Sequence, residues 1–179
     1  LLYFLNNLFD LLYFIYRYDH WEQKIAVIGA GPAGLSCAYY LATKGYKPTV
    51  FEKNEKPGGI MRYGIPSYKL GKDIIDAEID IIKELGVEIK CGVEVGRDIT
   101  LGELRKQGFK AFYIAVGCQG GRMAGVCGED AAGLDIAVNF LHDAIEHSDR
   151  KIDGDAVVIG GGNVAVDCAR TAHRFGASK

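Results

Sequence analysis

The run GAGPAG at positions 29–34 is a candidate phosphate-binding turn. Gly29 would permit a tight turn, Gly31 would let the backbone approach a pyrophosphate, and Gly34 would let a following helix pack closely on the preceding strand. The start of that helix adds free N–H groups and a positive dipole end. Glu52 follows 18 residues after Gly34, at the distance where a carboxylate can accept hydrogen bonds from a ribose diol. This spacing predicts a dinucleotide-binding site.

A second glycine-rich run, GGGNVA at 160–165, repeats the first after 131 residues. Gly160 and Gly162 take the first two glycine roles, and Ala165 replaces the third glycine with another small residue. The residue equivalent to Glu52 would lie beyond residue 179. The sequence therefore leaves open whether the second turn binds NADPH or NADH.

The segments around these turns alternate between strand and helix patterns. Strands are expected at 24–28, 47–53, 87–95, 109–117 and, before the second turn, 156–159; helices are expected at 35–43, 72–85, 101–108 and 134–145, and after the second turn. Thr100 and Glu103 have the spacing of a capping box for the helix at 101–108. The strand at 109–117 is apolar enough to be read as buried. The predicted fold is α/β, with two nested Rossmann-like dinucleotide-binding domains of which the second is incomplete.

Composition narrows the class of protein. The chain has 179 residues, 49% hydrophobic and 25% charged, which suits a globular fold and disfavours disorder. A net charge of -2 without a basic run argues against a nucleic-acid partner. The five cysteines are scattered and include no CxxC pair, which favours reduced thiols in a cytoplasmic protein and argues against a disulfide-reducing pair. No metal site is expected.

The N-terminal segment 1–23 is rich in leucine and aromatic residues and is expected to form an apolar helix. Asn6, Asp10 and Arg17 would share one narrow stripe and leave a broad apolar face. Such a face would pack on this protein's own domain or on a partner domain; the alternatives are a membrane surface or a sequence artefact. A membrane partner is the less favoured reading.

The run GGIMRYGIPSYKL at 58–70 gives the most specific signal. Together with GAGPAG and GGGNVAVDCART, it resembles the small (β) subunit of glutamate synthase and its relatives, NAD(P)H-oxidising flavoproteins that include the N-terminal module of dihydropyrimidine dehydrogenase. The resemblance covers residues 24–179. It implies FAD on the first turn, NADPH or NADH on the second, and hydride transfer from nicotinamide to flavin. Because the cofactors supply the reactivity, no catalytic side chain is predicted.

The resemblance also implies a set of cofactor-binding positions. For the FAD pyrophosphate these are Gly29, Gly31, Pro32, Ala33 and Gly34, and for the adenosine end they are Glu52, Lys53 and Val95. For the flavin side they are Gly59, Arg62 and Ile65, with Ala115 and Gly117 in the loop AVG, where Val116 replaces a threonine of the family. For the nicotinamide nucleotide they are Gly161, Gly162, Asn163 and Val164. Arg62 would position a phosphate or stabilise a reduced flavin; the alternative is a solvent-facing role.

The expected organisation is the N-terminal part of an FAD-binding domain at 24–150 and the start of a truncated NAD(P)-binding domain at 151–179, within a longer flavoprotein. The expected function is an FAD-dependent oxidoreductase that passes electrons to a partner subunit or domain. Two alternatives stay open: a non-catalytic nucleotide-binding fragment, or a reductase of ferredoxin or another acceptor. The coenzyme, final acceptor and oligomeric state are not determined by the sequence.

Overall fold

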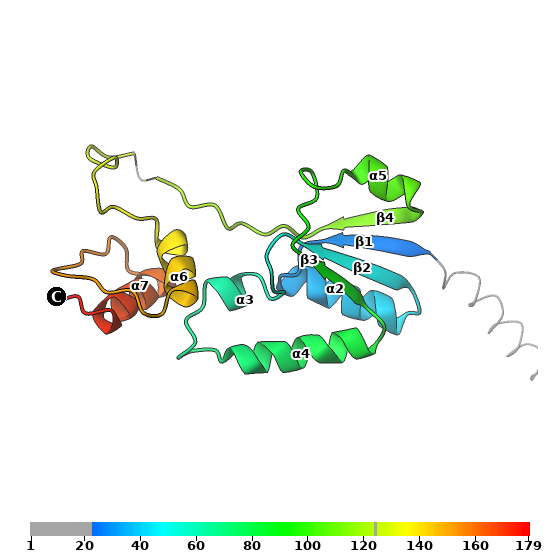
Figure 1. The fold of residues 1–179 in the computed structure, drawn as a ribbon, viewed down its shortest axis with the longest axis horizontal. Helices are drawn as coiled ribbons and strands as arrows, with labels where there is room; N and C mark the ends of the chain where they lie inside the picture. Colours follow the sequence, from blue (N-terminus) through cyan, green and yellow to red (C-terminus); the bar gives the residue numbers. More distant parts are fainter. Residues whose placement is uncertain (1–22, 124) are drawn as a thin grey trace, which may run out of the picture. The chain divides into compact units, whose positions relative to one another are not determined.

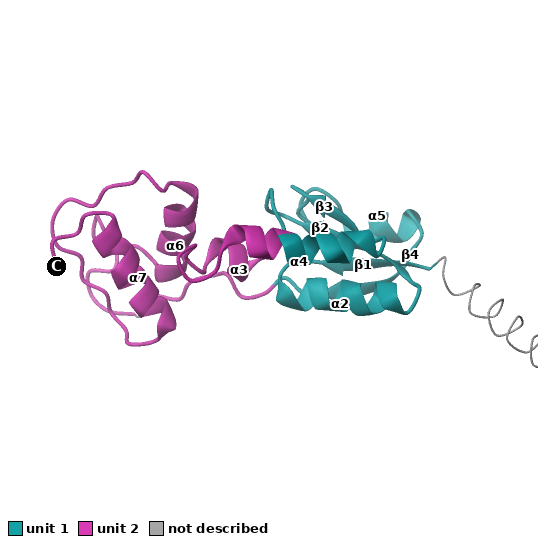
Figure 2. Ribbon diagram, turned by 90° about the horizontal axis from the view of Figure 1, so that it is seen from below, with its two compact units in different colours: residues 1–57, 77–116 teal, residues 58–76, 117–179 magenta. Residues whose placement is uncertain are grey.

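The computed structural model describes residues 23–123 and 125–179 (Figure 1). The helix expected at 1–23 lies outside the described residues apart from its last position. Two compact units are present (Figure 2): the first comprises 77–116 with the described part of 1–57, and the second comprises 58–76 and 117–179. The proposed domain boundary at residue 150 stays a prediction.

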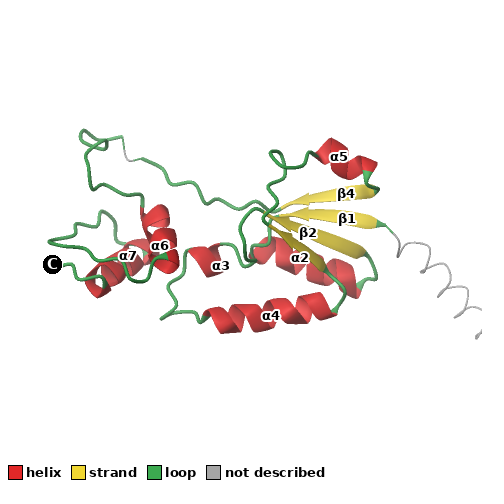
Figure 3. Ribbon diagram, in the orientation of Figure 1, coloured by secondary structure: helices red, strands yellow, loops and turns green. Residues whose placement is uncertain are grey.

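The first unit is built on a parallel sheet of four strands in the order β3-β2-β1-β4 (Figures 1 and 3). The strands are β1 (Lys24–Ile28), β2 (Lys47–Glu52), β3 (Glu88–Cys91) and β4 (Phe109–Ile114). The chain moves outward from β1 through β2 to β3 and then returns to the other side of β1 as β4. Strand order therefore reverses between β1 and β4, and ligands of open α/β sheets bind at such a point, beyond the carboxyl ends of the strands. The expected α/β class is confirmed.

Residues along β1 alternate between the two faces of the sheet. Helix α2 (Pro32–Thr43) packs on β1 and β2, and Val27 faces it, because a Cβ placed on Gly34 of that helix would lie 3.3 Å from Cγ1 of Val27. A core cluster is formed by Ala26, Ile28, Phe51, Leu104 and Phe109. Helix α5 (Leu101–Lys106) contributes Leu104 and contacts β4. The expected capping box at the start of α5 is present.

Two strands differ from the sequence expectation. The strand expected to be buried at 109–117 forms as β4, but it lies at the sheet edge within the described part of the chain, and Tyr113 and Ile114 are 43% and 58% exposed. The strand expected at 87–95 ends at Cys91. Beyond it, Gly92 takes a positive φ of 70° and donates its N–H to the carbonyl of Asn54, and the N–H of Val93 donates to the carbonyl of Glu52 at 2.9 Å.

The second unit contains short helices joined by loops. They are α3 (Ile60–Tyr63), α6 (Ala137–Glu146) and α7 (Asn163–Arg174), and the unit boundary falls inside α4 (Lys72–Glu84). Helix α6 packs on α7 and on α3, where the rings of Tyr63 and His142 stack with centroids 5.0 Å apart. The helix expected at 134–145 is confirmed as α6, although it begins at Ala137.

Candidate cofactor-binding sites

The first glycine turn follows β1 directly, at the point where strand order reverses. Gly29 has a φ of 106°, which favours glycine. A Cβ on Gly29 would lie 2.3 Å from the carbonyl oxygen of Ala115, the residue that follows β4. The N–H of Ala115 donates to the carbonyl of Ile28 at 2.8 Å, so the loop after β4 is held against the end of β1. Only glycine fits at position 29 without moving this backbone.

The first turn of α2 presents backbone N–H groups with no side-chain cap in the described structure. Gly31 is the N-cap in an extended conformation. Pro32 is the first helical residue, where its missing N–H removes no hydrogen bond of the helix. Gly34 is buried, and a Cβ there would lie 1.9 Å from the carbonyl oxygen of Gly29. Pro32 and Ala33 are exposed. An uncapped helix start beside a backbone without side chains is suited to bind an anion.

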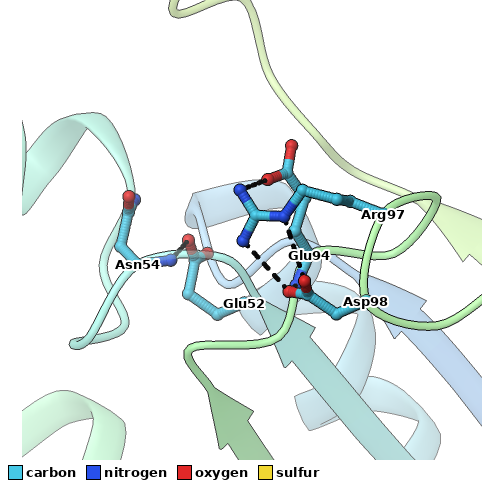
Figure 4. A network of polar contacts seen from close by, with 5 residues as sticks. All are labelled: Glu52, Asn54, Glu94, Arg97 and Asp98. Carbon is cyan, nitrogen blue, oxygen red and sulfur yellow. Dashed lines mark hydrogen bonds and ion pairs between the residues drawn. The ribbon is translucent and has the colours of Figure 1, made fainter.

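Glu52 ends β2 beside this turn, and only 4% of it is exposed. Its Oε2 accepts the N–H of Ala30 at 2.8 Å, and its Oε1 accepts the N–H of Asn54 at 2.9 Å (Figure 4). Each carboxylate oxygen retains further acceptor capacity. The carboxylate is therefore held in place by the backbone and can still accept hydrogen bonds from a diol. The next residue, Lys53, is exposed.

A second polar network in the first unit lies in the loop after β3 (Figure 4). Arg97 pairs with Glu94 at 2.8 Å and with Asp98 at 3.0 Å, and its hydrogen bond is the main cause that lowers the pKa of Asp98. The Arg97 side chain is 71% exposed, which indicates a solvated network that shapes the loop. Val95 in this loop is half-buried and packs against the core cluster of the sheet. Its predicted contact with adenine stays a prediction.

Residues 58–65 form a tightly turned segment in the second unit. Gly59 is buried, has a φ of 53° and is the N-cap of α3. Arg62 is 5% exposed and pairs with Asp76, so the solvent-facing alternative for Arg62 is wrong. Ile65 is half-buried, and its N–H donates to the carbonyl of Ile60 at 3.0 Å.

Lys72 holds this segment in place through hydrogen bonds to its backbone, a role that the sequence analysis does not predict. Its Nζ donates to the carbonyls of Met61 at 3.0 Å and Ile65 at 2.6 Å. Burial, and secondarily the charge of Arg62, lower the pKa of Lys72. Both acceptors are backbone atoms, which any residue supplies. The sequence therefore shows that Lys72 lies at the start of α4 but not which groups it contacts.

The second glycine turn reproduces the backbone of the first. Gly160 has a φ of 139°, and the N-cap Gly162 has φ −81° and ψ 176°, against −79° and −177° at Gly31. Helices α2 and α7 both have 12 residues. The N–H of Ala177 donates to the carbonyl of Ala172 at 3.1 Å, as the N–H of Tyr46 does to that of Leu41 at 3.0 Å. The internal repeat is thus a repeat of structure.

The strand expected at 156–159 does not form, although the chain there begins to pair. The N–H of Ser178 donates to the carbonyl of Gly154 at 2.8 Å, and the N–H of Ala156 to that of Lys179 at 3.1 Å. The first bond is the one expected if Asp155 and Ser178 paired as Lys24 and Lys47 do in β1 and β2, whereas the second is shifted by one residue. Val157 and Ile159 are 89% and 88% exposed. No described strand flanks this segment as β4 and β2 flank β1, and an extended segment without such neighbours does not form a stable ladder.

The predicted site residues thus fall into separate groups. The first unit brings together the glycine turn, Glu52, Lys53 and Ala115 around the ends of β1, β2 and β4. The second unit contains the flavin-side residues Gly59, Arg62 and Ile65, and the nicotinamide-side residues Gly161, Gly162, Asn163 and Val164, all four of which are exposed. Gly117 begins the second segment of the second unit, has a φ of 71° and is exposed.

Two kinds of feature are missing from residues 23–123 and 125–179. No group of three or more His, Cys, Asp or Glu side chains is arranged to hold a metal ion there. Within the same residues, no helix has the length and apolar character needed to cross a membrane.

Comparison with known proteins agrees with this arrangement. The pyridine nucleotide-disulphide oxidoreductase family matches residues 23–178. The β subunit of NADP(+)-dependent formate dehydrogenase from Moorella thermoacetica is 48% identical over 158 residues, covering 87% of this chain and 22% of that protein. The small chain of NADPH glutamate synthase from Halomonas elongata is 38% identical over 167 residues, covering 88% of this chain and 35% of that protein. The chain therefore spans about a quarter to a third of these relatives.

Among solved structures, FprA from Mycobacterium tuberculosis in complex with NADPH superposes with a TM-score of 0.73 and 29% identity, covering 83% of this chain and 36% of that one. The resemblance to the glutamate synthase small subunit and its relatives is confirmed by these matches. On its sequence and on its fold, the chain belongs to the pyridine nucleotide-disulphide oxidoreductase family.

Proposed function

We propose that this chain forms the FAD-binding and part of the NAD(P)H-binding portion of a flavoprotein that oxidises NADPH or NADH and passes the electrons to a partner subunit. The observation that carries the proposal is the structural repeat, because two turns with one backbone conformation suit two dinucleotides. Family members bind FAD and NAD(P)H. The scattered cysteines favour a cytoplasmic location for this protein.

We assign FAD to the first turn. The uncapped start of α2 would receive the pyrophosphate, and Glu52 would accept hydrogen bonds from the adenosine ribose. Ala30 and Asn54 hold that carboxylate before any ligand arrives. Ala115 follows β4 beside the first turn, and Ala115 and Gly117 would line the path toward the flavin.

The second turn suits the nicotinamide coenzyme. Gly161 and Gly162 leave the start of α7 without a side-chain cap in the described structure, so its N–H groups could receive a second pyrophosphate. Asn163 and Val164 begin the helix there. Gly59, Arg62 and Ile65 would lie on the flavin side, in the segment that Lys72 holds in place.

FAD held at these residues would supply a hydride acceptor for the reduced nicotinamide and a donor of two electrons to an acceptor. The protein's part is to bind both cofactors, align them and exclude water; no side-chain acid or base is required. A partner subunit would be the acceptor, as in relatives that are themselves subunits of larger enzymes.

A dye-linked assay tests this function. FAD-loaded protein is mixed with NADPH or NADH and an artificial electron acceptor such as ferricyanide, which removes any need for the natural partner. We expect oxidation of one coenzyme that depends on added FAD. Binding of FAD without oxidation of either coenzyme would instead support a non-catalytic nucleotide-binding role. Adding a ferredoxin in place of the dye examines the alternative acceptor.

A further inference from the structure

The segment at 66–70 is joined to α7 by a partly buried ion pair inside the second unit. The Nζ of Lys69 donates to both oxygens of Asp167, at 2.8 and 3.0 Å. The Asp167 side chain is only 8% exposed, whereas that of Lys69 is 39% exposed. A carboxylate that is this buried depends on its partner, because removing the cation would leave an uncompensated charge.

A second contact joins the same two elements. The guanidinium groups of Arg170 and Arg174 lie over the ring of Tyr68, 4.5 and 3.8 Å from its centroid. Cation–π contacts at such distances are attractive and depend on the ring rather than on the phenol hydroxyl. We call Tyr68, Lys69, Asp167, Arg170 and Arg174 the helix clamp.

The structural repeat shows that the helix clamp is an addition to the nucleotide-binding unit. The positions of α2 that correspond to Asp167, Arg170 and Arg174 are Ser36, Tyr39 and Thr43, and all three are exposed. Helix α2 keeps the same length and turn without them. The repeated turn and helix therefore form without a buried acid or a pair of arginines at these positions.

We propose that the helix clamp positions the coenzyme-binding turn relative to the flavin-side segment, a role that rests on the proposed function. Asp167 lies one helical turn after Asn163, where α7 begins behind Gly162. Lys69 lies just beyond Ile65 on the flavin-side segment. Because a helix is rigid over one turn, fixing Asp167 to Lys69 fixes the helix start that would hold the coenzyme. Tyr68 and Lys69 are positioning residues in this account.

The test measures the rate at which the preferred coenzyme reduces the FAD-loaded protein under anaerobic conditions. The two are mixed rapidly at a range of coenzyme concentrations, and the limiting rate of flavin reduction is determined. Lys69→Met removes the ion pair, and Tyr68→Leu removes the ring while leaving no buried charge. Small errors in the alignment of reacting groups are costly, so each should lower the limiting rate of reduction by about tenfold to a hundredfold. Lys69→Arg and Tyr68→Phe keep the charge and the ring and should restore most of the rate.

Lys83→Met is the matched control, because it removes a lysine from the exposed ion pair with Asp80 in α4. It should leave the rate unchanged. FAD content should also stay unchanged in every variant, because the first turn and Glu52 are left intact. The proposal is overturned if Tyr68→Leu folds, binds FAD and is reduced at the parent rate. It is also overturned if Tyr68→Phe lowers the limiting rate of reduction as much as Tyr68→Leu does. Failure of the parent protein to be reduced by either coenzyme overturns the proposed function itself and the helix clamp with it.

Discussion

At the scale of single residues, Glu52 joins two loops while it retains capacity for a ligand. Its carboxylate ties the turn after β1, through Ala30, to the loop after β2, through Asn54. The position of Glu52 could be predicted because the spacing from Gly34 follows from the length of one helix and one strand. The partners could not, because both are backbone N–H groups that any residue supplies.

Glu52→Gln should weaken FAD binding. The amide retains one acceptor oxygen but replaces the other with a donor, so the bonds to Ala30, Asn54 and a ribose diol cannot all be made. Losing a charge-assisted hydrogen bond costs about 1.5–3 kcal/mol, so the dissociation constant for FAD should rise by about tenfold or more. Flavin fluorescence quenching measures it. Glu88→Gln, an exposed position on the neighbouring strand, is the control and should bind FAD like the parent.

The cysteines should differ sharply in reactivity. Burial, then the charges of Asp167 and Asp135, raise the pKa of Cys168 to about 11, whereas Cys118 and Cys127 are exposed. Cys168 should therefore resist alkylation at neutral pH while the two exposed thiols react, as mass spectrometry of iodoacetamide-treated protein would show. Because the folded pKa lies above the unfolded value of 9.0, this thiol's contribution to stability is complete below pH 9.0 and falls as pH rises toward about 11. Rapid alkylation of native Cys168 at neutral pH would contradict this environment.

Among the elements, α2 and α7 differ in the third small residue of the glycine turn that precedes each helix. Gly34 is required in the first turn by the carbonyl of Gly29, whereas the second turn accommodates Ala165 at the same place. The sequence predicted both helices from their glycine spacing. It did not show that Val157 and Ile159 would stay exposed, because a strand's burial depends on neighbours outside its own segment.

Gly34→Ala should destabilise the first unit. The new Cβ would lie 1.9 Å from the carbonyl oxygen of Gly29, so the helix must shift away from the turn. Overpacking of this kind costs about 1–3 kcal/mol in the free energy of unfolding, measured by urea denaturation. Gly102→Ala in α5 is the control, because its nearest neighbour would be 3.8 Å away, and it should be neutral or stabilising. Equal stability of the two variants would show that α2 is not held so closely.

Thr100→Ala should remove the capping box of α5. The Thr100 hydroxyl accepts the N–H of Glu103 at 3.2 Å, and the Glu103 carboxylate accepts the N–H of Thr100 at 2.8 Å. Losing an N-cap costs about 1 kcal/mol of stability, and a urea titration can resolve that difference. Thr43→Ala, at an exposed position at the end of α2, should change stability by less than about 0.5 kcal/mol. If Thr100→Ala behaved like Thr43→Ala, the cap would contribute nothing to α5.

At the scale of the whole molecule, the fold class followed from the alternation of strands and helices and from two turns of one pattern. The helix clamp did not follow from them, because Lys69 and Asp167 are 98 residues apart and neither belongs to a glycine motif. Aligning the two copies shows only that Asp167 stands where the first copy has Ser36, and this difference alone does not reveal that Asp167 is buried. Contacts between distant segments are set by packing, which periodicity does not encode.

The proposed function requires this chain to contain the protein's part of a path for hydride from a nicotinamide to FAD. The most direct measurement is the visible absorption spectrum of the FAD-loaded protein before and after anaerobic addition of NADPH and, separately, NADH. We expect the flavin band to bleach with one coenzyme in a two-electron reduction with no other acceptor present. A protein that retains FAD and keeps its oxidised spectrum with both coenzymes would contradict the account.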